Sequence, residues 1–169
     1  YIPLEDRPEI DRWIISSLNT LVRTVTANFD AYEPTQAGRA MEEFLDNQLS
    51  NWYVRLCRRR FWKGEYAHDK ICAYQTLYEC LETLSRLMAP IAPFFADWLF
   101  MNLNQVTGRI KEQSVHHAAF PQVNEKVIQT DLEKRMQLAQ DNSSLILSIR
   151  KKVNIKVRST SVISSNRFT

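Results

Sequence analysis

Apolar residues recur at spacings of three and four along this 169-residue chain, and that periodicity limits its fold more than any other feature. Because an α-helix completes a turn about every 3.6 residues, such spacing places side chains on one helical face. The first stripe predicts a long amphipathic helix that begins after Pro8 and is broken by residues 30–34. Its members are Ile10, Ile14, Leu18, Leu21, Val25 and Phe29.

Two more stripes predict a second and a third helix. The second runs from an N-cap at Thr35 to about Trp62. The third is capped by Asp69 and ends near Ala89, because Pro90 lacks a backbone donor and clashes with the preceding turn. The predicted apolar seam of the second helix is Met41, Leu45, Leu49, Trp52 and Leu56, and that of the third is Ile71, Tyr74, Leu77, Tyr78, Leu81, Leu84 and Met88.

The remainder of the chain adds shorter or weaker elements. Further helices are predicted over roughly 94–103 and 131–151, with an irregular segment at 104–129 and strand-like alternation at 153–158. Only three glycines and six prolines are present, which favours long helices over many short strands. We expect an all-α fold, an antiparallel helix bundle, with one domain over residues 1–158 and a tail over 159–169.

Basic residues are concentrated in two short islands that contain no acid. The net charge is only +3 while the islands together carry +10, so the rest of the chain carries −7. This distribution predicts a localised anionic partner. The islands consist of Arg55, Arg58, Arg59, Arg60 and Lys63, and of Arg150, Lys151, Lys152, Lys156 and Arg158.

The sequence favours a reduced, cytoplasmic setting without a membrane. Three cysteines cannot form a closed disulfide framework, and no signal peptide is evident. The most apolar run, 87–101, is too short to span a bilayer and contains two prolines and Asp97. Since the chain opens on Tyr1 and an extended segment, we interpret it as a piece of a larger protein.

No reaction centre is predicted. The three glycines are isolated, so they cannot form a phosphate-binding loop, and His116 and His117 have no nearby cysteine to complete a metal site. No serine lies in a nucleophile-elbow sequence. We therefore predict no catalytic residue, metal or cofactor in this chain.

The stretch NWYVRLCRRRFW (51–62) separates into two faces when it is projected as an α-helix. Trp52 and Leu56 fall on the core side, and Arg59 and Arg60 fall at the boundary, where they need carboxylate or carbonyl partners. The residues of the outward stripe are Asn51, Arg55, Arg58 and Trp62.

Two interpretations of the outward stripe remain open. Its arginines could be solvated charges that favour the helix C-terminus, with Trp62 packed on a neighbouring helix. Alternatively the stripe binds nucleic acid, with arginines on phosphates and the aromatic ring as a platform for an unpaired base. The second basic island favours the nucleic-acid interpretation.

Five blocks in one order resemble the helical anticodon-binding domain of class I (class Ia) aminoacyl-tRNA synthetases, and isoleucyl-tRNA synthetase most of all. The ATP-binding signatures of that family, HIGH and KMSKS, are absent from this piece. The tail STSVISSNRFT departs from the Gln-Pro-Leu continuation that is usual in the isoleucyl form. The blocks are DRWIISSLNTLV (11–22), DNQLSNWYVRLCRRRFW (46–62), LMAPIAPFFADWLF (87–100), SVHHAAFP (114–121) and RKKVNIKVR (150–158).

The resemblance implies that this piece binds the anticodon stem-loop of tRNA(Ile) and catalyses nothing alone. Its parent would ligate isoleucine to tRNA using ATP and Mg, through a catalytic core in the same polypeptide. The alternatives are the same domain of a valyl or leucyl enzyme, or a helical scaffold that docks an acidic protein partner. The tRNA contacts implied are Asn51, Arg55, Arg58 and Trp62, with Lys151, Lys152, Lys156 and Arg158 as a second patch.

Overall fold

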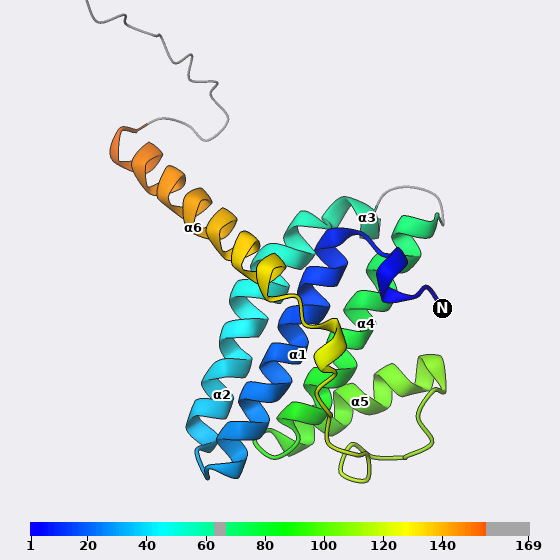
Figure 1. The fold of residues 1–169 in the computed structure, drawn as a ribbon. Helices are drawn as coiled ribbons and strands as arrows, with labels where there is room; N and C mark the ends of the chain where they lie inside the picture. Colours follow the sequence, from blue (N-terminus) through cyan, green and yellow to red (C-terminus); the bar gives the residue numbers. More distant parts are fainter. Residues whose placement is uncertain (63–66, 155–169) are drawn as a thin grey trace, which may run out of the picture. The chain divides into compact units, whose positions relative to one another are not determined.

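The computed structural model describes residues 1–62 and 67–154, and within these ranges the chain is helical and contains no strand (Figure 1). The all-α prediction is therefore confirmed. Residues 1–130 form one compact unit, and the chain from Asp131 onward forms a second; each is described by itself. The elements are η1 (Leu4–Asp6), α1 (Glu9–Asp30), α2 (Pro34–Glu43), η2 (Phe44–Val54), α3 (Arg58–Trp62), α4 (His68–Met88), α5 (Pro93–Thr107), η3 (Glu125–Val127) and α6 (Thr130–Lys152).

Prolines set several helix boundaries, much as the sequence predicts. Helix α1 begins directly after Pro8 and ends at Asp30, and α4 ends at Met88, two residues before Pro90. Between α1 and α2, Tyr32 adopts a left-handed conformation with φ of 58°. The predicted N-cap at Thr35 is wrong, because Pro34 already occupies the first turn of α2, where its fixed φ and missing N–H suit a helix start.

The segment η2 is a π-helix, and this changes which side chains face the core. The predicted seam of the second helix is partly wrong: Leu56 is 55% exposed and Trp52 is half-buried. A π-helix turn holds more residues than an α-helix turn, so each residue rotates the chain by less than 100°. An α-helical projection therefore assigns the wrong residues to the buried face of η2. The buried residues of η2 are Phe44, Leu49 and Tyr53, and Cys57 and Phe61 continue the buried row after it.

Helix α1 packs against α2, η2 and α4. Its predicted stripe is buried at Ile14, Leu18, Leu21 and Val25, whereas its two ends, Ile10 and Phe29, are half-buried. The seam of α4 differs from its prediction, since Ile71 and Tyr74 are exposed. The buried face of α4 instead carries small side chains, which allow close helix approach but give little apolar signal in sequence. These are Cys72, Ala73, Thr76 and Cys80, followed by Leu84 and Leu87.

All three cysteines are buried free thiols. Burial raises the pKa of the Cys80 thiol, and also that of Cys57 and Cys72. The protonated thiols therefore serve as small core side chains.

The end of α5 is fixed by side-chain hydrogen bonds. The helix continues to Thr107, beyond the predicted end, and Gly108 follows in the left-handed conformation that glycine adopts without steric cost. The Asn104 side chain donates to the carbonyl oxygen of Ile110 at 2.6 Å and accepts from its N–H at 2.9 Å. The irregular chain after residue 108 is thus tied back to the helix.

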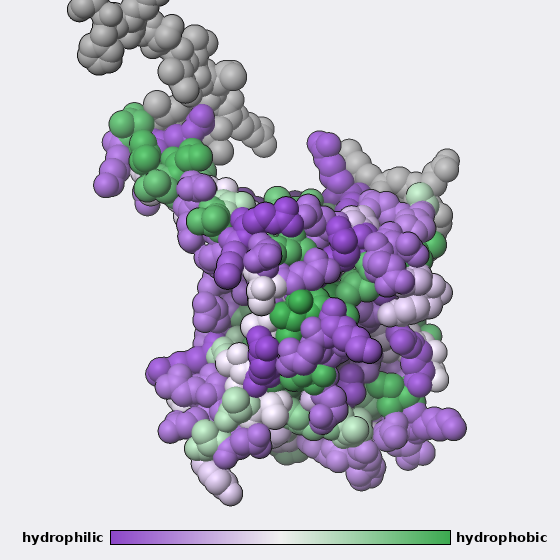
Figure 2. Space-filling view, in the orientation of Figure 1, coloured by the Kyte–Doolittle hydropathy of each residue, from purple (hydrophilic) through white to green (hydrophobic). Residues whose placement is uncertain are grey.

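Helix α6 makes up the described part of the second unit. It is followed by a turn at Val153 and Asn154, so the predicted strand does not begin there. The rest of that predicted strand, and the predicted tail at 159–169, lie outside the described residues. Figure 2 shows apolar residues gathered along α6; those at least half exposed are Leu138, Leu145, Ile146 and Ile149, and Val153 in the following turn is exposed as well. None of the helices in the described ranges has the length and hydropathy needed to cross a bilayer.

Candidate nucleic-acid interface

The outward stripe lies on the surface of the first unit. Asn51 is on η2, Arg55 follows it, and Arg58 and Trp62 are on α3; all four are exposed. Trp62 is 78% exposed, so it does not pack on a neighbouring helix. Arg59 is exposed as well, contrary to the prediction that it lies at the boundary and needs a partner. The surface therefore presents three guanidinium groups and one indole ring.

A buried ion pair fixes α3, the helix that carries Arg58 and Trp62 of this stripe. The carboxylate of Asp11 on α1 is fully buried and accepts from both terminal nitrogens of Arg60, each at 2.7 Å. Arg60 also donates through Nε to Asp69 on α4 at 3.0 Å. The prediction that Arg60 needs carboxylate partners is confirmed, and its guanidinium joins α3 to two other helices.

Tyr53 completes the buried network. Its hydroxyl donates to Oδ1 of Asp11 at 2.7 Å. Burial and the neighbouring Asp11 carboxylate raise the pKa of Tyr53, so its hydroxyl stays protonated as a donor. Burial disfavours the Arg60 charge, but the hydrogen bonds to Asp11 raise the pKa of Arg60 overall. Around neutral pH Tyr53 is therefore a neutral donor and Arg60 a cation.

Aromatic contacts on the buried side of α3 also hold this helix in place. The ring of Phe61 lies edge-on to Tyr53, with 6.3 Å between centroids, and edge-on to Tyr74, with 5.5 Å. The Tyr74 hydroxyl donates to the Phe61 carbonyl oxygen at 3.2 Å. Since Phe61 is buried and Trp62 is exposed, these contacts hold the backbone that presents the Trp62 ring.

Sequence reasoning missed Asp11 as the anchor of this surface. Its position near the start of α1 is explained equally well by a favourable helix-dipole interaction, as for Glu9. The feature that could have identified Asp11 is its position on the buried side of the helix, beside Trp13 and Ile14. A buried carboxylate is stable when it is paired, and within the described residues Arg60 forms the ion pair with it.

The second patch is described only in part. Lys151 and Lys152 are exposed in the last turn of α6, where lysine suits the helix dipole. Lys156 and Arg158 lie outside the described residues.

Asp97 of α5 joins two of the five sequence blocks, LMAPIAPFFADWLF (87–100) and SVHHAAFP (114–121). Its Oδ1 atom accepts from the Ser114 hydroxyl at 2.7 Å and from the Val115 N–H at 2.9 Å. These two hydrogen bonds lower the pKa of the Asp97 carboxyl below its ordinary value. The bonds fasten the SVHHAAFP segment to α5 and bury Val115 against Ala96 and Phe100.

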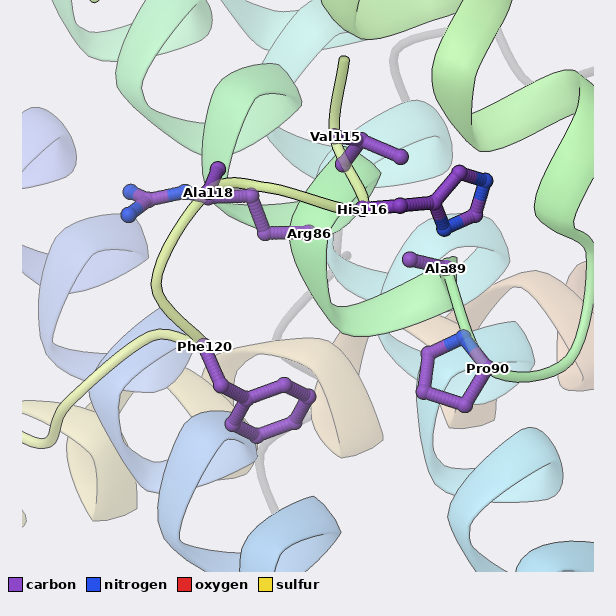
Figure 3. Close-up of a pocket in the computed structure, with 7 residues that line it drawn as sticks. All are labelled: Arg86, Ala89, Pro90, Val115, His116, Ala118 and Phe120. Carbon is purple, nitrogen blue, oxygen red and sulfur yellow. The ribbon is translucent and has the colours of Figure 1, made fainter. Parts of the chain in front are cut away.

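A pocket of about 230 Å³ lies next to this junction (Figure 3). It is lined by polar groups from Arg86 and His116, but in Figure 3 these two side chains point to opposite sides. The Arg86 guanidinium pairs with Glu82 at 3.0 Å. The polar groups of this pocket do not point toward a common site, whereas catalysis requires that arrangement.

The Asp97 junction predicts a pH-dependent contribution to stability. Because the folded pKa is lowered, the contribution should be present above the ordinary value of 3.8 and lost as the pH falls through the folded pKa. Urea unfolding of the wild type and Asp97→Asn should therefore differ most near neutral pH and converge on acidification. Asp46→Asn, at an exposed position, is the control. A difference that stays constant from neutral pH to pH 3 would contradict this role.

Comparison with known proteins gives one consistent result. Residues 11–164 match a family described as "Anticodon-binding domain of tRNA ligase". The chain is 58% identical to an isoleucine–tRNA ligase of Bacteroides fragilis and 59% identical to one of Cytophaga hutchinsonii, in each case over 93% of this chain and 14% of the relative. It is 48% identical to an isoleucine–tRNA ligase of Dehalococcoides mccartyi, over 89% of this chain and 15% of the relative. The chain thus spans about one seventh of the length of the curated relatives it matches.

Proposed function

This chain belongs to the family of anticodon-binding domains of tRNA ligases, and from that premise we propose that its outward stripe holds the anticodon stem-loop of a tRNA. The observation that carries the proposal is the exposure of Arg55, Arg58 and Trp62, of which Arg58 and Trp62 lie on α3, the helix that the buried Asp11–Arg60 pair fixes in place. The stripe is thereby presented as a preformed surface.

The chemistry of the stripe suits single-stranded RNA. Guanidinium groups bind phosphates through paired N–H donors, and residues 55–62 contain no acid that would oppose them. An exposed indole offers a flat surface on which an unpaired base can stack. Phosphate contacts position the RNA, while the splayed bases of the loop carry the sequence information.

We further propose that the chain works as part of an isoleucine–tRNA ligase, whose tRNA is tRNA(Ile). The relatives named above are isoleucine–tRNA ligases, which favours this assignment over a valyl or leucyl enzyme. Ligation would use ATP and Mg in a catalytic core of the same cytoplasmic polypeptide. The part played by this chain is binding alone. Lys151, Lys152, Lys156 and Arg158 would add a second set of phosphate contacts.

A salt titration tests the electrostatic part of the proposal. Each phosphate contact adds about −0.7 to −0.9 to the slope of log affinity against log salt concentration. Arg58→Ala should weaken tRNA binding and make the slope shallower by about that amount, without changing the melting temperature. Arg39→Ala, an exposed arginine on α2, is the matched control and should change neither quantity.

Two results would contradict the proposal. Binding that is insensitive to salt would remove the phosphate contacts from the account. Equal competition by heparin and by tRNA would instead support a scaffold that docks any acidic partner, without a preference for the anticodon arm.

A further inference from the structure

Helix α5 exposes a row of large apolar side chains, here called the α5 aromatic face. Its members lie at helical spacing, so they share one side of the helix, while Ala96 and Phe100 on the opposite side are buried. The members and their exposed fractions are Phe94 at 91%, Phe95 at 53%, Trp98 at 56% and Met101 at 45%.

The face is aromatic and uncharged. The rings of Phe95 and Trp98 lie against each other with 5.8 Å between centroids. Residues 87–108 contain no lysine or arginine, and their one charged side chain is Asp97. A surface without cations does not suit RNA or an anionic membrane, because both require positive charge. A contiguous apolar patch of this kind is typical of a protein–protein interface.

The path of the chain indicates which protein surface covers it. Tyr1 is held at the end of α5: the guanidinium of Arg109 lies 5.8 Å from the centroid of its ring and 5.7 Å from that of Tyr78. The neighbouring Ile2 N–H donates to Oε1 of Gln75 on α4 at 3.1 Å. Figure 1 likewise places the N-terminus near the last turns of α5. Polypeptide that precedes Tyr1 therefore leaves this unit beside α5, whereas the connection at the other end runs through α6 in the second unit.

We propose that the α5 aromatic face is the docking surface for the part of the ligase polypeptide that precedes Tyr1. This inference rests on the proposed function in one respect, namely that the chain works within a longer tRNA ligase; the relatives are about seven times its length. Docking there would orient the anticodon-binding unit against the rest of the enzyme. The tRNA surface at Arg55, Arg58 and Trp62 belongs to a different element and would stay free.

Site-specific photo-cross-linking in the full-length polypeptide tests this. With p-benzoylphenylalanine in place of Met101, irradiation without tRNA should give an intramolecular product whose peptides map upstream of Tyr1. The same photo-residue at Tyr32, which is 92% exposed in the link between α1 and α2, is the control and should give a several-fold lower yield of that product. A second variant at Phe94 guards against local disruption at position 101.

Each other outcome overturns the proposal. A product that maps downstream of this chain assigns the face to a different segment, and a product between isotopically distinct copies assigns it to a dimer. A failure to form any upstream product shows that this segment does not cover the face, and an upstream product that is equally abundant from Tyr32 is nonspecific. Because the experiment omits tRNA, an upstream product would stand even if the tRNA titration failed.

Discussion

Replacing Asp11 with alanine should lower the free energy of unfolding by about 3–5 kcal/mol, because it removes the buried partner of the Arg60 charge and leaves only the exposed Asp69. The Arg60 side chain is only 15% exposed, and Asp11 provides two of its shortest hydrogen bonds. The substitution also removes the acceptor of the Tyr53 hydroxyl. Since Arg60 belongs to α3, loss of the pair should loosen the helix that presents Arg58 and Trp62.

Urea unfolding of a graded set of variants measures this effect. Tyr53→Phe removes one hydrogen bond and should cost about 1 kcal/mol. Asp69 is the outer partner of Arg60, and the Asp69 side chain is 55% exposed. Asp69→Ala should therefore cost only about 0–1 kcal/mol. If Asp11→Ala were no more destabilising than Asp69→Ala, the buried pair would not be the anchor of this surface.

The helices of the fold follow from local signals in the sequence, but their core faces follow only in part. Prolines at positions 8, 34 and 90 mark helix boundaries through the geometry of their own backbone, so no tertiary information is needed. The core face after Phe44 depends on the π-helix, which a fixed rotation of 100° per residue does not represent. Leu56 was consequently assigned to the core and Tyr53 was not.

The candidate site divides in the same way. The exposure of the outward stripe was predicted, because helical projection places its residues away from the apolar seam. The Asp11–Arg60 pair was not predicted, since it joins residues 49 apart through the packing of α1 on α3. The α5 aromatic face was not predicted either, because a buried helix face and a docking surface have the same apolar pattern.

Trp62→Ala should weaken binding of the anticodon stem-loop by about 5- to 150-fold, which corresponds to the roughly 1–3 kcal/mol that one base–aromatic stack contributes. The ring is 78% exposed, so the substitution removes little buried surface and should leave the melting temperature nearly unchanged. A loss of affinity without a loss of stability would show that the Trp62 ring stacks on RNA and does not pack against the protein.

The central claim, that the outward stripe is a surface for the anticodon arm, is tested most directly by titrating anticodon stem-loop RNA against four forms of the full-length polypeptide. These are the wild type, Trp62→Ala, Trp62→Phe and Tyr32→Ala. We predict that Trp62→Ala alone loses most of its affinity, that Trp62→Phe retains much of it because an aromatic face remains, and that Tyr32→Ala binds like the wild type. Binding by Trp62→Ala that equals the wild type would contradict the claim.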